Sequence, residues 1–527
     1  MLEGTGVNAI RGVDVRHARM RQVFSVSIFP LVALFGLTWT LPAEAGIVPV
    51  VVTGDASPVA GATYSAFDIP VISDDGRIIF SATIAGGSVT SGTNQGLFVT
   101  AGSGASLLAR KGSVSPMGGT YGGAFNDPML RGGTLLFRNI PSGTLTAGLF
   151  GGTNLSAPAL LGQSTNTSIK GRVDAQGDVA FGTVVSGGSR QYFVAAKTGS
   201  VLSSPTALAA SDTNANRPGE IWMNDHGSVA FAEYFSASSQ GMFLSAVTTP
   251  GARTTAATVT QSAPWVTAGA VYNAIGGGGF NNHGDAAYVA SFSYSGGGGA
   301  DGLFLRAANG TTTLLAKQGD TSPAGGTFSS FFHPNIGPTV LTDAGNVVFA
   351  ARTGAWDAAQ SDTAIYSLGV NGGRTIARQN DPVPGLGGTF VYSDLYTAGQ
   401  ELGVDAAGRV LFTANLDDTT TVGLDGTGLM LYDPATDKVS ILLRTGGLFD
   451  IRGDGSIFSS IDAVAIALPS SSDPSNHDPV GAMYGNQLTF RLDFHNGMSG
   501  IYTAAVPEPG VLGTLALVAS LGVRRRR

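Results

Sequence analysis

The sequence predicts an all-β protein built from a repeated four-stranded unit. One reason is a ten-residue phrase that returns along the chain and is clearest at residues 224–233, Asn-Asp-His-Gly-Ser-Val-Ala-Phe-Ala-Glu. Its aromatic residue recurs about every 59 residues, as in repeat folds. The second reason is composition: 77 of 527 residues are Gly and only 12% are charged, which is typical of short strands joined by tight turns.

The recurring phrase predicts a tight turn that leads into a strand. Asn or Asp can close the turn on its own backbone, and Gly227 can supply the positive φ that such a turn often needs. Val229 and Phe231 then share one face of a half-buried strand. Five copies are clear and three are degenerate, and their aromatic residues are Phe80, Phe137, Phe181, Phe231, Tyr288, Phe349, Phe412 and Phe490.

The strand of the recurring phrase is the second strand of the repeated unit, and three further phrases mark the other strands. The first strand carries Gly-Gly-Thr-aromatic, as at residues 325–328, and the third carries Gly-Leu-Phe, as at 302–304. The fourth is a short apolar run that ends in a basic residue, as at 314–317. Four strands at this period resemble one blade of a β-propeller. We therefore expect eight four-stranded blades over residues 46–505, with the third and fourth units eroded in their first and last strands.

The two ends of this body predict closure of the ring. Residues 50–55 match a fourth strand and its turn although no unit precedes them, and the eighth unit stops after a third strand at 500–502. We expect the N-terminal strand to complete the last blade, because closure removes the exposed strand edges of an open array. An open solenoid is the alternative, and it would need polar capping repeats that the sequence lacks.

The N-terminus is predicted to be an export signal. Basic residues precede an apolar run over residues 23–41, and Ala43 and Ala45 then form an Ala-x-Ala site that predicts cleavage before Gly46. Met20 is an alternative start, because the stretch before the basic region is long for a leader. An uncut N-terminal membrane anchor is the other interpretation of the apolar run, which we expect to be helical.

The C-terminus carries a second addressing pattern. Pro507, Glu508 and Pro509 are followed by an apolar run and then by four arginines, Arg524, Arg525, Arg526 and Arg527. This order resembles the C-terminal sorting segment of the PEP-CTERM class of bacterial surface proteins, in which Pro-Glu-Pro precedes a membrane-spanning helix and a basic cluster. The Asn-x-x-Gly-x-Val-Ala-Phe repeat is similar to the tandem-repeat bodies that accompany such anchors, and it implies no activity.

The resemblance implies an exosortase-type membrane protease as a partner and a location in the cell envelope, at the surface or in the extracellular matrix. The apolar run over residues 511–523 is short for a full membrane span, which favours a transient anchor. The basic cluster should stay on the cytoplasmic side. The expected domains are thus a signal peptide at 1–45, the repeat body at 46–505 and the sorting segment at 506–527.

The charge and the absence of Cys limit the possible functions. Removal of residues 1–45 and 506–527 deletes eight of the 29 basic residues and four of the 36 acidic ones, which leaves a net charge near −11. This balance argues against nucleic acid as a partner, since binding to phosphates needs a basic surface. The chain has no Cys, which excludes disulfides, thiol catalysis and thiolate metal sites.

Several polar positions are candidate sites, each with a plain structural alternative. His226 and His283 occupy the same turn position in successive units and could share a metal ion. Other units hold Asp, Gln or Ala there, which favours a tolerant exposed turn. Glu220, Trp222 and Glu233 offer a carboxylate pair with an aromatic platform, as glycan-cleaving sites use, and drift within a repeat is the alternative.

Two acidic loops, at residues 417–426 and 450–455, offer oxygen ligands for Ca²⁺ but match neither an EF-hand nor the Gly-Gly-x-Gly-x-Asp nonapeptide repeat, so solvated turns are favoured. Residues 452–454 spell the adhesion-like tripeptide Arg-Gly-Asp. The sequence contains no nucleophile-elbow, zinc-protease or phosphate-loop motif. It therefore assigns no catalytic or metal-binding residue, and Ca²⁺ is the only cofactor that it suggests.

The sequence predicts an exported surface or matrix protein whose propeller is structural or binds a glycan, such as a surface polysaccharide, or a protein. The alternative is a surface polysaccharide hydrolase or lyase on the same scaffold. Clustering of Glu220, Trp222, Glu233 and His283 around one pocket would favour the enzyme, and scattering would remove it. A spacer without a ligand cannot be separated from the first hypothesis by sequence.

Overall fold

The structure is a computed structural model, and it describes residues 46–102, 104–165, 169–184, 190–208, 221–236, 239–264, 266, 269–331, 339–354, 362–386, 388–395, 402–420, 426–467 and 481–506. All regular secondary-structure elements in these ranges are β-strands, which confirms the all-β prediction. The same ranges contain no helix that is long and apolar enough to cross a membrane. The two predicted hydrophobic helices lie outside the described residues.

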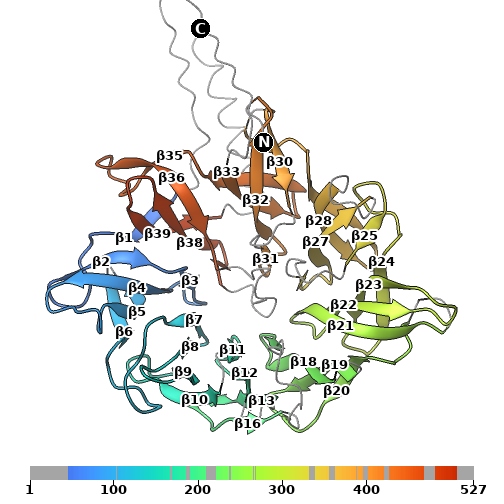
Figure 1. Cartoon of the computed structure of the whole chain (residues 1–527), viewed down its shortest axis with the longest axis horizontal. Coiled ribbons are helices and arrows are strands. Elements are labelled where there is room, and N and C mark those ends of the chain that lie inside the picture. The colour runs from blue at the N-terminus through green and yellow to red at the C-terminus, as the bar shows by residue number, and fades with distance from the viewer. Residues whose placement is uncertain are drawn as a thin grey trace, which may run out of the picture. The chain divides into compact units, whose positions relative to one another are not determined.

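Eight antiparallel sheets follow one another around a centre, which confirms a propeller of eight blades (Figure 1). The strands of the first four blades, in chain order, are β2 (Ala62–Phe67), β3 (Val71–Ile72), β4 (Ile78–Gly86), β5 (Gln95–Ala101) and β6 (Gly104–Arg110); β7 (Asn126–Arg131), β8 (Thr134–Asn139), β9 (Ala147–Gly152) and β10 (Ala159–Ser164); β11 (Lys170–Val173), β12 (Val179–Val184), β13 (Arg190–Ala195) and β16 (Thr206–Ala207), with a hairpin of β14 (Lys197–Thr198) and β15 (Val201–Leu202); and β17 (Ile221–Met223), β18 (Ser228–Ser236), β19 (Ser239–Ala246) and β20 (Thr254–Thr258).

The second half of the ring repeats this order. Its strands are β21 (Val271–Phe280), β22 (Ala286–Ser293), β23 (Gly299–Arg306) and β24 (Thr312–Lys317); β25 (Phe328–Ser330), β26 (Val340–Leu341), β27 (Val347–Thr353), β28 (Asp362–Gly369) and β29 (Gly372–Arg378); β30 (Phe390–Asp394), β31 (Leu402–Val404), β32 (Val410–Asp418), β33 (Gly426–Asp433) and β34 (Lys438–Arg444); and β35 (Leu448–Asp450), β36 (Phe458–Ala465), β37 (Met483–Tyr484), β38 (Gln487–Phe494) and β39 (Ser499–Ala505), joined by β1 (Val48–Val52).

The strand of the recurring phrase is the second in each blade and lies between the first and the third. In blade 4, Phe231 of β18 is opposite Ile221 on one side and Phe243 on the other. The eight predicted aromatic residues are all at most 2% exposed. Most of them contact the aromatic residue of the Gly-Leu-Phe phrase, as Phe80 does with Phe98 at a centroid distance of 5.5 Å. Such ring pairs add to the area that each blade buries.

The predicted first strand is broken into two pieces in several blades. In blade 1, β2 and β3 pair one after the other with β4, and Pro70 lies in the interruption. Proline cannot donate a ladder hydrogen bond, so the strand leaves the sheet there. Within the described residues, the prediction of four strands per blade is confirmed for the sheets of blades 2 to 5. The sheets of blades 1, 6 and 7 have five described strands, and that of blade 8 has six.

The ring closes as the sequence predicts, and the open solenoid is wrong. β1 pairs antiparallel with β39, with Val48 opposite Thr503 and Val52 opposite Gly500, and so forms the last strand of blade 8. Val51 packs in the cluster between blades 8 and 1, and Val52 packs in the cluster between blades 7 and 8. The N-terminal strand therefore fills both neighbouring interfaces.

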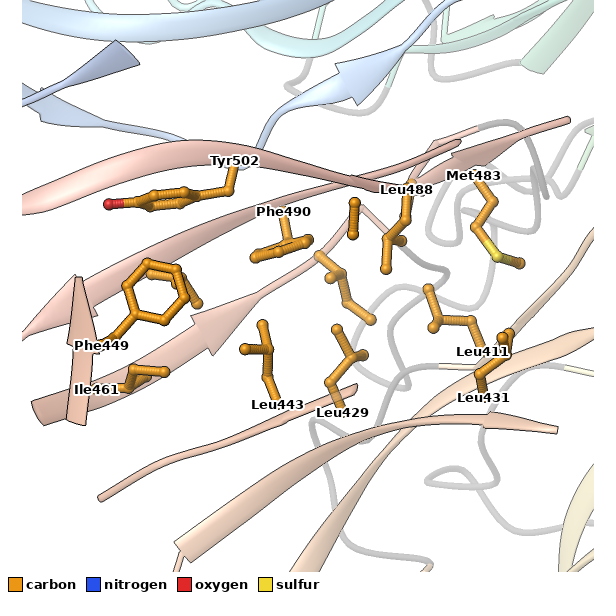
Figure 2. Packing of buried hydrophobic residues seen from close by; sticks show 14 of the residues in the cluster. Leu411, Leu429, Leu431, Leu443, Phe449, Ile461, Met483, Leu488, Phe490 and Tyr502 are labelled. Carbon is orange, nitrogen blue, oxygen red and sulfur yellow. The ribbon is translucent and has the colours of Figure 1, made fainter. Parts of the chain in front are cut away.

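The core consists of clusters between adjacent blades. Figure 2 shows the cluster between blades 7 and 8, where Phe490 and Tyr502 of blade 8 face Leu429 and Leu443 of blade 7. Each sheet thus buries both faces against its neighbours. This packing fixes the inner strands around the centre of the ring, where the candidate site lies.

Candidate functional site

The turns of the recurring phrase build the wall of the central channel. Asn224 closes the turn of blade 4, because its Oδ1 accepts hydrogen bonds from the backbone N–H groups of His226 at 3.1 Å and Ser228 at 2.9 Å. Gly227 has a φ of 71°, which a glycine adopts without strain. Three other blades repeat the arrangement with Asp174, Asn281 and Asp405. The predicted turn is therefore confirmed.

Amide side chains link these turns from blade to blade. Nδ2 of Asn224 donates to the carbonyl oxygen of Asn281 at 3.0 Å, and Nδ2 of Asn281 donates to that of Thr342 at 3.1 Å. Because Asn224, Asn281 and Thr342 are all buried, these hydrogen bonds hold the wall of blades 4, 5 and 6 in one fixed arrangement.

The residue after each of these positions forms a second linked row. Nδ2 of Asn282 donates to Asp225 at 3.1 Å and to Asp343 at 3.0 Å. The backbone N–H of Asp225 donates to Oδ1 of Asn282 at 2.8 Å, and the backbone N–H of Asn282 donates to Oδ1 of Asp343 at 2.9 Å. Three polar side chains from blades 4, 5 and 6 are thus preorganised side by side.

A cavity of about 240 Å³ lies against this row. Seven of the eight blades contribute described residues to its lining, which places it in the central channel. The lining side chains that matter below are Arg131, Trp222, Asp225, Asn282, Asp343 and Tyr484. A concave site with a few fixed polar groups and aromatic surface is the usual form of a small-molecule site.

One ion pair joins blades 2 and 4, the two neighbours of blade 3. Nη1 of Arg131, from blade 2, lies 2.6 Å from Oδ1 of Asp225, from blade 4. The two side chains are 12% and 26% exposed, so the pair is only partly screened by water. At the corresponding position of blade 3 stands Ala175, which also lines the cavity and leaves room for the arginine.

A second ion pair lies at the opposite side of the ring. Arg409 contacts Asp405 at 2.6 Å, and both side chains are at most 6% exposed. Arg409 also donates to the carbonyl oxygen of Gly485 in blade 8 at 2.6 Å. The charge of Asp405 is therefore balanced within the wall.

Two aromatic residues line the cavity, and they differ in exposure. Trp222 is 5% exposed and belongs to the core cluster between blades 4 and 5, so most of its ring is structural. Tyr484 of β37 is 39% exposed and offers an accessible aromatic surface. The sequence predicted Trp222 as a candidate and missed Tyr484, because the eighth copy of the phrase is degenerate.

Asp174 is the buried carboxyl group of the blade 3 turn. Its side chain is 0% exposed, and Oδ1 accepts the backbone N–H groups of Gln176 and Asp178 at 2.9 and 2.8 Å. Oδ2 is buried and has no hydrogen-bond partner among the described residues. Burial, and then the charge of Asp178, raises the pKa of Asp174 to about 7, although its hydrogen bonds act in the opposite direction.

Of the predicted enzyme cluster, the structure describes the side chains of Trp222 and His283, and of these two only Trp222 lines the cavity. His226 and His283 are exposed, and neither lines the cavity, as the turn interpretation predicts. Glu220 lies outside the described residues, and Glu233 lies beyond Phe231 on β18, away from the turn. The described part of the chain holds no group of three or more His, Asp or Glu side chains placed to bind a metal ion.

The acidic loops have the contacts of capped turns. Oδ2 of Asp450 accepts the backbone N–H of Gly455 at 2.7 Å, and Asp418 accepts that of Thr420 at 3.0 Å. In the Arg-Gly-Asp tripeptide, Arg452 forms an ion pair with Asp55 at 2.8 Å, which ties blade 8 to the turn after β1. Residues 421–425, the signal cleavage residues Ala43 and Ala45, and the sorting residues Pro507, Glu508, Pro509 and Arg524 to Arg527 lie outside the described residues.

Comparison with known proteins gives a family and remote structural likenesses. A model described as a family of unknown function (DUF7453) matches residues 34–139 and 149–512. No curated protein matches the chain. TolB from Acinetobacter baumannii is 11% identical, with 72% of this chain and 80% of that chain covered and a TM-score of 0.29. An acylaminoacyl peptidase from Pyrococcus horikoshii is 9% identical, with 67% and 50% covered and a TM-score of 0.31. Likenesses this low carry no argument about function.

Proposed function

The chain belongs to the family of unknown function DUF7453, and we propose that it is an exported surface or matrix protein that binds a saccharide in the central channel of its propeller. The observation that carries the proposal is the fixed row of Asp225, Asn282 and Asp343 along the cavity. Each sugar hydroxyl can donate a hydrogen bond to a fixed acceptor. Both N–H groups of the Asn282 side chain are used within the row, so the row offers the carboxylate oxygens of Asp225 and Asp343 as acceptors in fixed neighbouring positions.

The size and the aromatic surface of the cavity support the same ligand class. Its volume of about 240 Å³ is just below the range of drug-sized sites, so it suits one or two sugar rings or the end of a longer chain. Tyr484 presents an aromatic surface against which the apolar face of a sugar ring can pack. A surface or matrix polysaccharide would supply such a ligand.

Binding is tested by screening immobilised glycans with the protein that lacks residues 1–45. We expect saturable binding to a limited set of saccharides, because the wall is rigid and its polar groups have fixed positions. The protein denatured by heat serves as the control for adhesion through exposed apolar surface. Absence of binding to every saccharide in a broad panel would contradict the proposal.

The sorting proposal is tested by changes in the C-terminal segment, residues 507–527. Deletion of residues 507–527 is expected to abolish attachment to the envelope or matrix, and fractionation of the native cells measures it. Replacement of Pro507, Glu508 and Pro509 by Ala should have the same effect, because the resemblance assigns recognition to this motif. Unchanged localisation of both variants would contradict the sorting proposal and leave the binding proposal standing.

A further inference from the structure

Two carboxylates of blade 3 point to the same place beside the blade 4 turn. Asp174 closes the turn between β11 and β12, and Asp178 directly precedes β12. A Cβ atom added to Gly227 would lie 3.5 Å from Oδ2 of Asp174 and 3.5 Å from Oδ2 of Asp178. The two oxygen atoms therefore converge on one point at the junction of blades 3 and 4, and they are no more than twice that distance apart.

The hydrogen bonds of these carboxylates are on the other oxygen atoms. Oδ1 of Asp174 accepts backbone N–H groups of its own turn, and Oδ1 of Asp178 accepts the backbone N–H of Lys197 at 2.6 Å. Asp174 is 0% exposed, and its Oδ2 has no hydrogen-bond partner in the described part of the chain. The ammonium group of Lys197 donates to the carbonyl oxygen of Gly132 in blade 2. Oδ2 of Asp174 is thus a buried anionic acceptor that lacks a donor, which is costly.

Other blades provide a donor at the corresponding pair of positions. In blade 7, Asp405 forms an ion pair with Arg409 at 2.6 Å, and both side chains are at most 6% exposed. In blade 5, Nδ2 of Asn281 donates to Oδ2 of Asp285 at 3.0 Å. Blade 3 places two carboxylates at these positions. A cation between them would have the role that the guanidinium group has in blade 7.

The backbone of the next blade offers a third oxygen. Nδ2 of Asn224 donates to the carbonyl oxygen of Asn281, and Nδ2 of Asn281 donates to that of Thr342. By the same repeat, the carbonyl oxygen that corresponds to Oδ2 of Asp174 is that of Asn224. This group is also an acceptor, so a donor or a cation is needed between the two. Carboxylate and carbonyl oxygens are the ligands that hard cations prefer.

We propose that Ca²⁺ binds at the junction of blades 3 and 4, between Oδ2 of Asp174 and Oδ2 of Asp178, with the carbonyl oxygen of Asn224 and water as further ligands. The two carboxylates neutralise the ion, and Asp178 is only partly buried, so the ion and its water can enter from the solvent. Ligands from two separate turns suit the flexible coordination of Ca²⁺ better than the strict octahedron of Mg²⁺. The ion links blade 3 to the wall formed by blades 4 to 6.

The test is titration of the purified protein with CaCl₂ after removal of metal ions with EDTA. Calorimetry should show one site with a dissociation constant on the order of 10⁻⁴–10⁻³ M, as in extracellular calcium modules. The thermal midpoint should rise with the Ca²⁺ concentration, because the ion binds only the folded state. Asp174→Asn and Asp178→Asn should each weaken binding about ten-fold or more, since each removes one charged ligand.

The fold of Asp174→Asn can be checked in the same experiment. Blades 4 and 5 hold Asn at the corresponding position, so the variant should fold. In EDTA it should be at least as stable as the wild type, because the two wild-type carboxylates then lack a cation. Addition of Ca²⁺ should stabilise the wild type and leave the midpoint of the variant unchanged, which loss of structure would not produce.

The matched control is Asp285→Asn, which removes the same charge at the corresponding position of blade 5. It should keep the calcium affinity of the wild type. Absence of calcium binding by the wild type would overturn the inference. Equal weak binding by the wild type and all three variants would show an adventitious ion only and would overturn it as well. Both results leave the saccharide proposal standing, because that proposal rests on the channel and not on this junction.

Discussion

Replacement of Val52 by aspartate is expected to lower the free energy of unfolding by about 4 kcal/mol or more, because it places an unpaired charge in a closed core. Val52 is 2% exposed and lies in the cluster between blades 7 and 8. It also belongs to β1, whose pairing with β39 closes the ring. Loss of β1 would leave β39 as an open edge of the last blade.

Val48 provides the matched control on the same strand, because its side chain is 56% exposed. Val48→Asp should change the free energy of unfolding by no more than about 0.5 kcal/mol, as surface substitutions do. Urea denaturation of the two variants and the wild type measures the difference. A Val52→Asp protein as stable as Val48→Asp would mean that β1 does not close the ring.

Replacement of Asp174 by asparagine is expected to stabilise the protein above pH 7 by on the order of 2–4 kcal/mol, the equivalent of its pKa shift. The side chains of Asn224 and Asn281 show the reason. At their turns Nδ2 donates to a carbonyl oxygen of the next blade. In blade 3 the corresponding atom is Oδ2 of Asp174, a buried acceptor that lies toward Gly227 of the blade 4 turn. An amide there should regain the missing bond.

The raised pKa of Asp174 also predicts the direction in which the stability of the protein changes with pH. The folded pKa of Asp174 is about 7, above the ordinary value of 3.8, so the folded protein holds a proton that the unfolded chain releases. Wild-type stability relative to Asp174→Asn should therefore fall as the pH rises from about 4 to about 7 and stay level above. Denaturation midpoints across that range measure it. A difference between the two proteins that is constant with pH would show that Asp174 is not the titrating group.

The sequence predicted the parts of the fold that depend on local patterns. The turn at Asn224 and Gly227 and the burial of Phe231 follow from residue types within one phrase, and the structure confirms all three. The broken first strand could not be predicted, because the Gly-Gly-Thr-aromatic phrase marks only its outer piece. Pro70 was the one local sign of the interruption in blade 1.

The channel wall depends on contacts between blades, which no single phrase contains. Asp225 and Asn282 stand one position before His226 and His283, and sequence reasoning singled out the histidines instead. Only the ring shows that the earlier position faces the cavity and that the histidines are exposed. A signal did exist: the residue after the turn-closing position is polar in blades 1, 4, 5 and 6, whereas exposed turn positions drift.

The most direct test of the channel proposal uses two adjacent residues of the blade 7 turn. Ala406 and Ala407 are both exposed, but only Ala406 lines the cavity. We expect Ala406→Trp to fill the cavity and abolish binding of the best saccharide from the glycan screen, while Ala407→Trp keeps the wild-type affinity. Titration calorimetry of both variants with that saccharide is the measurement. Full affinity in Ala406→Trp would show that the saccharide binds elsewhere and that the central channel is not the site.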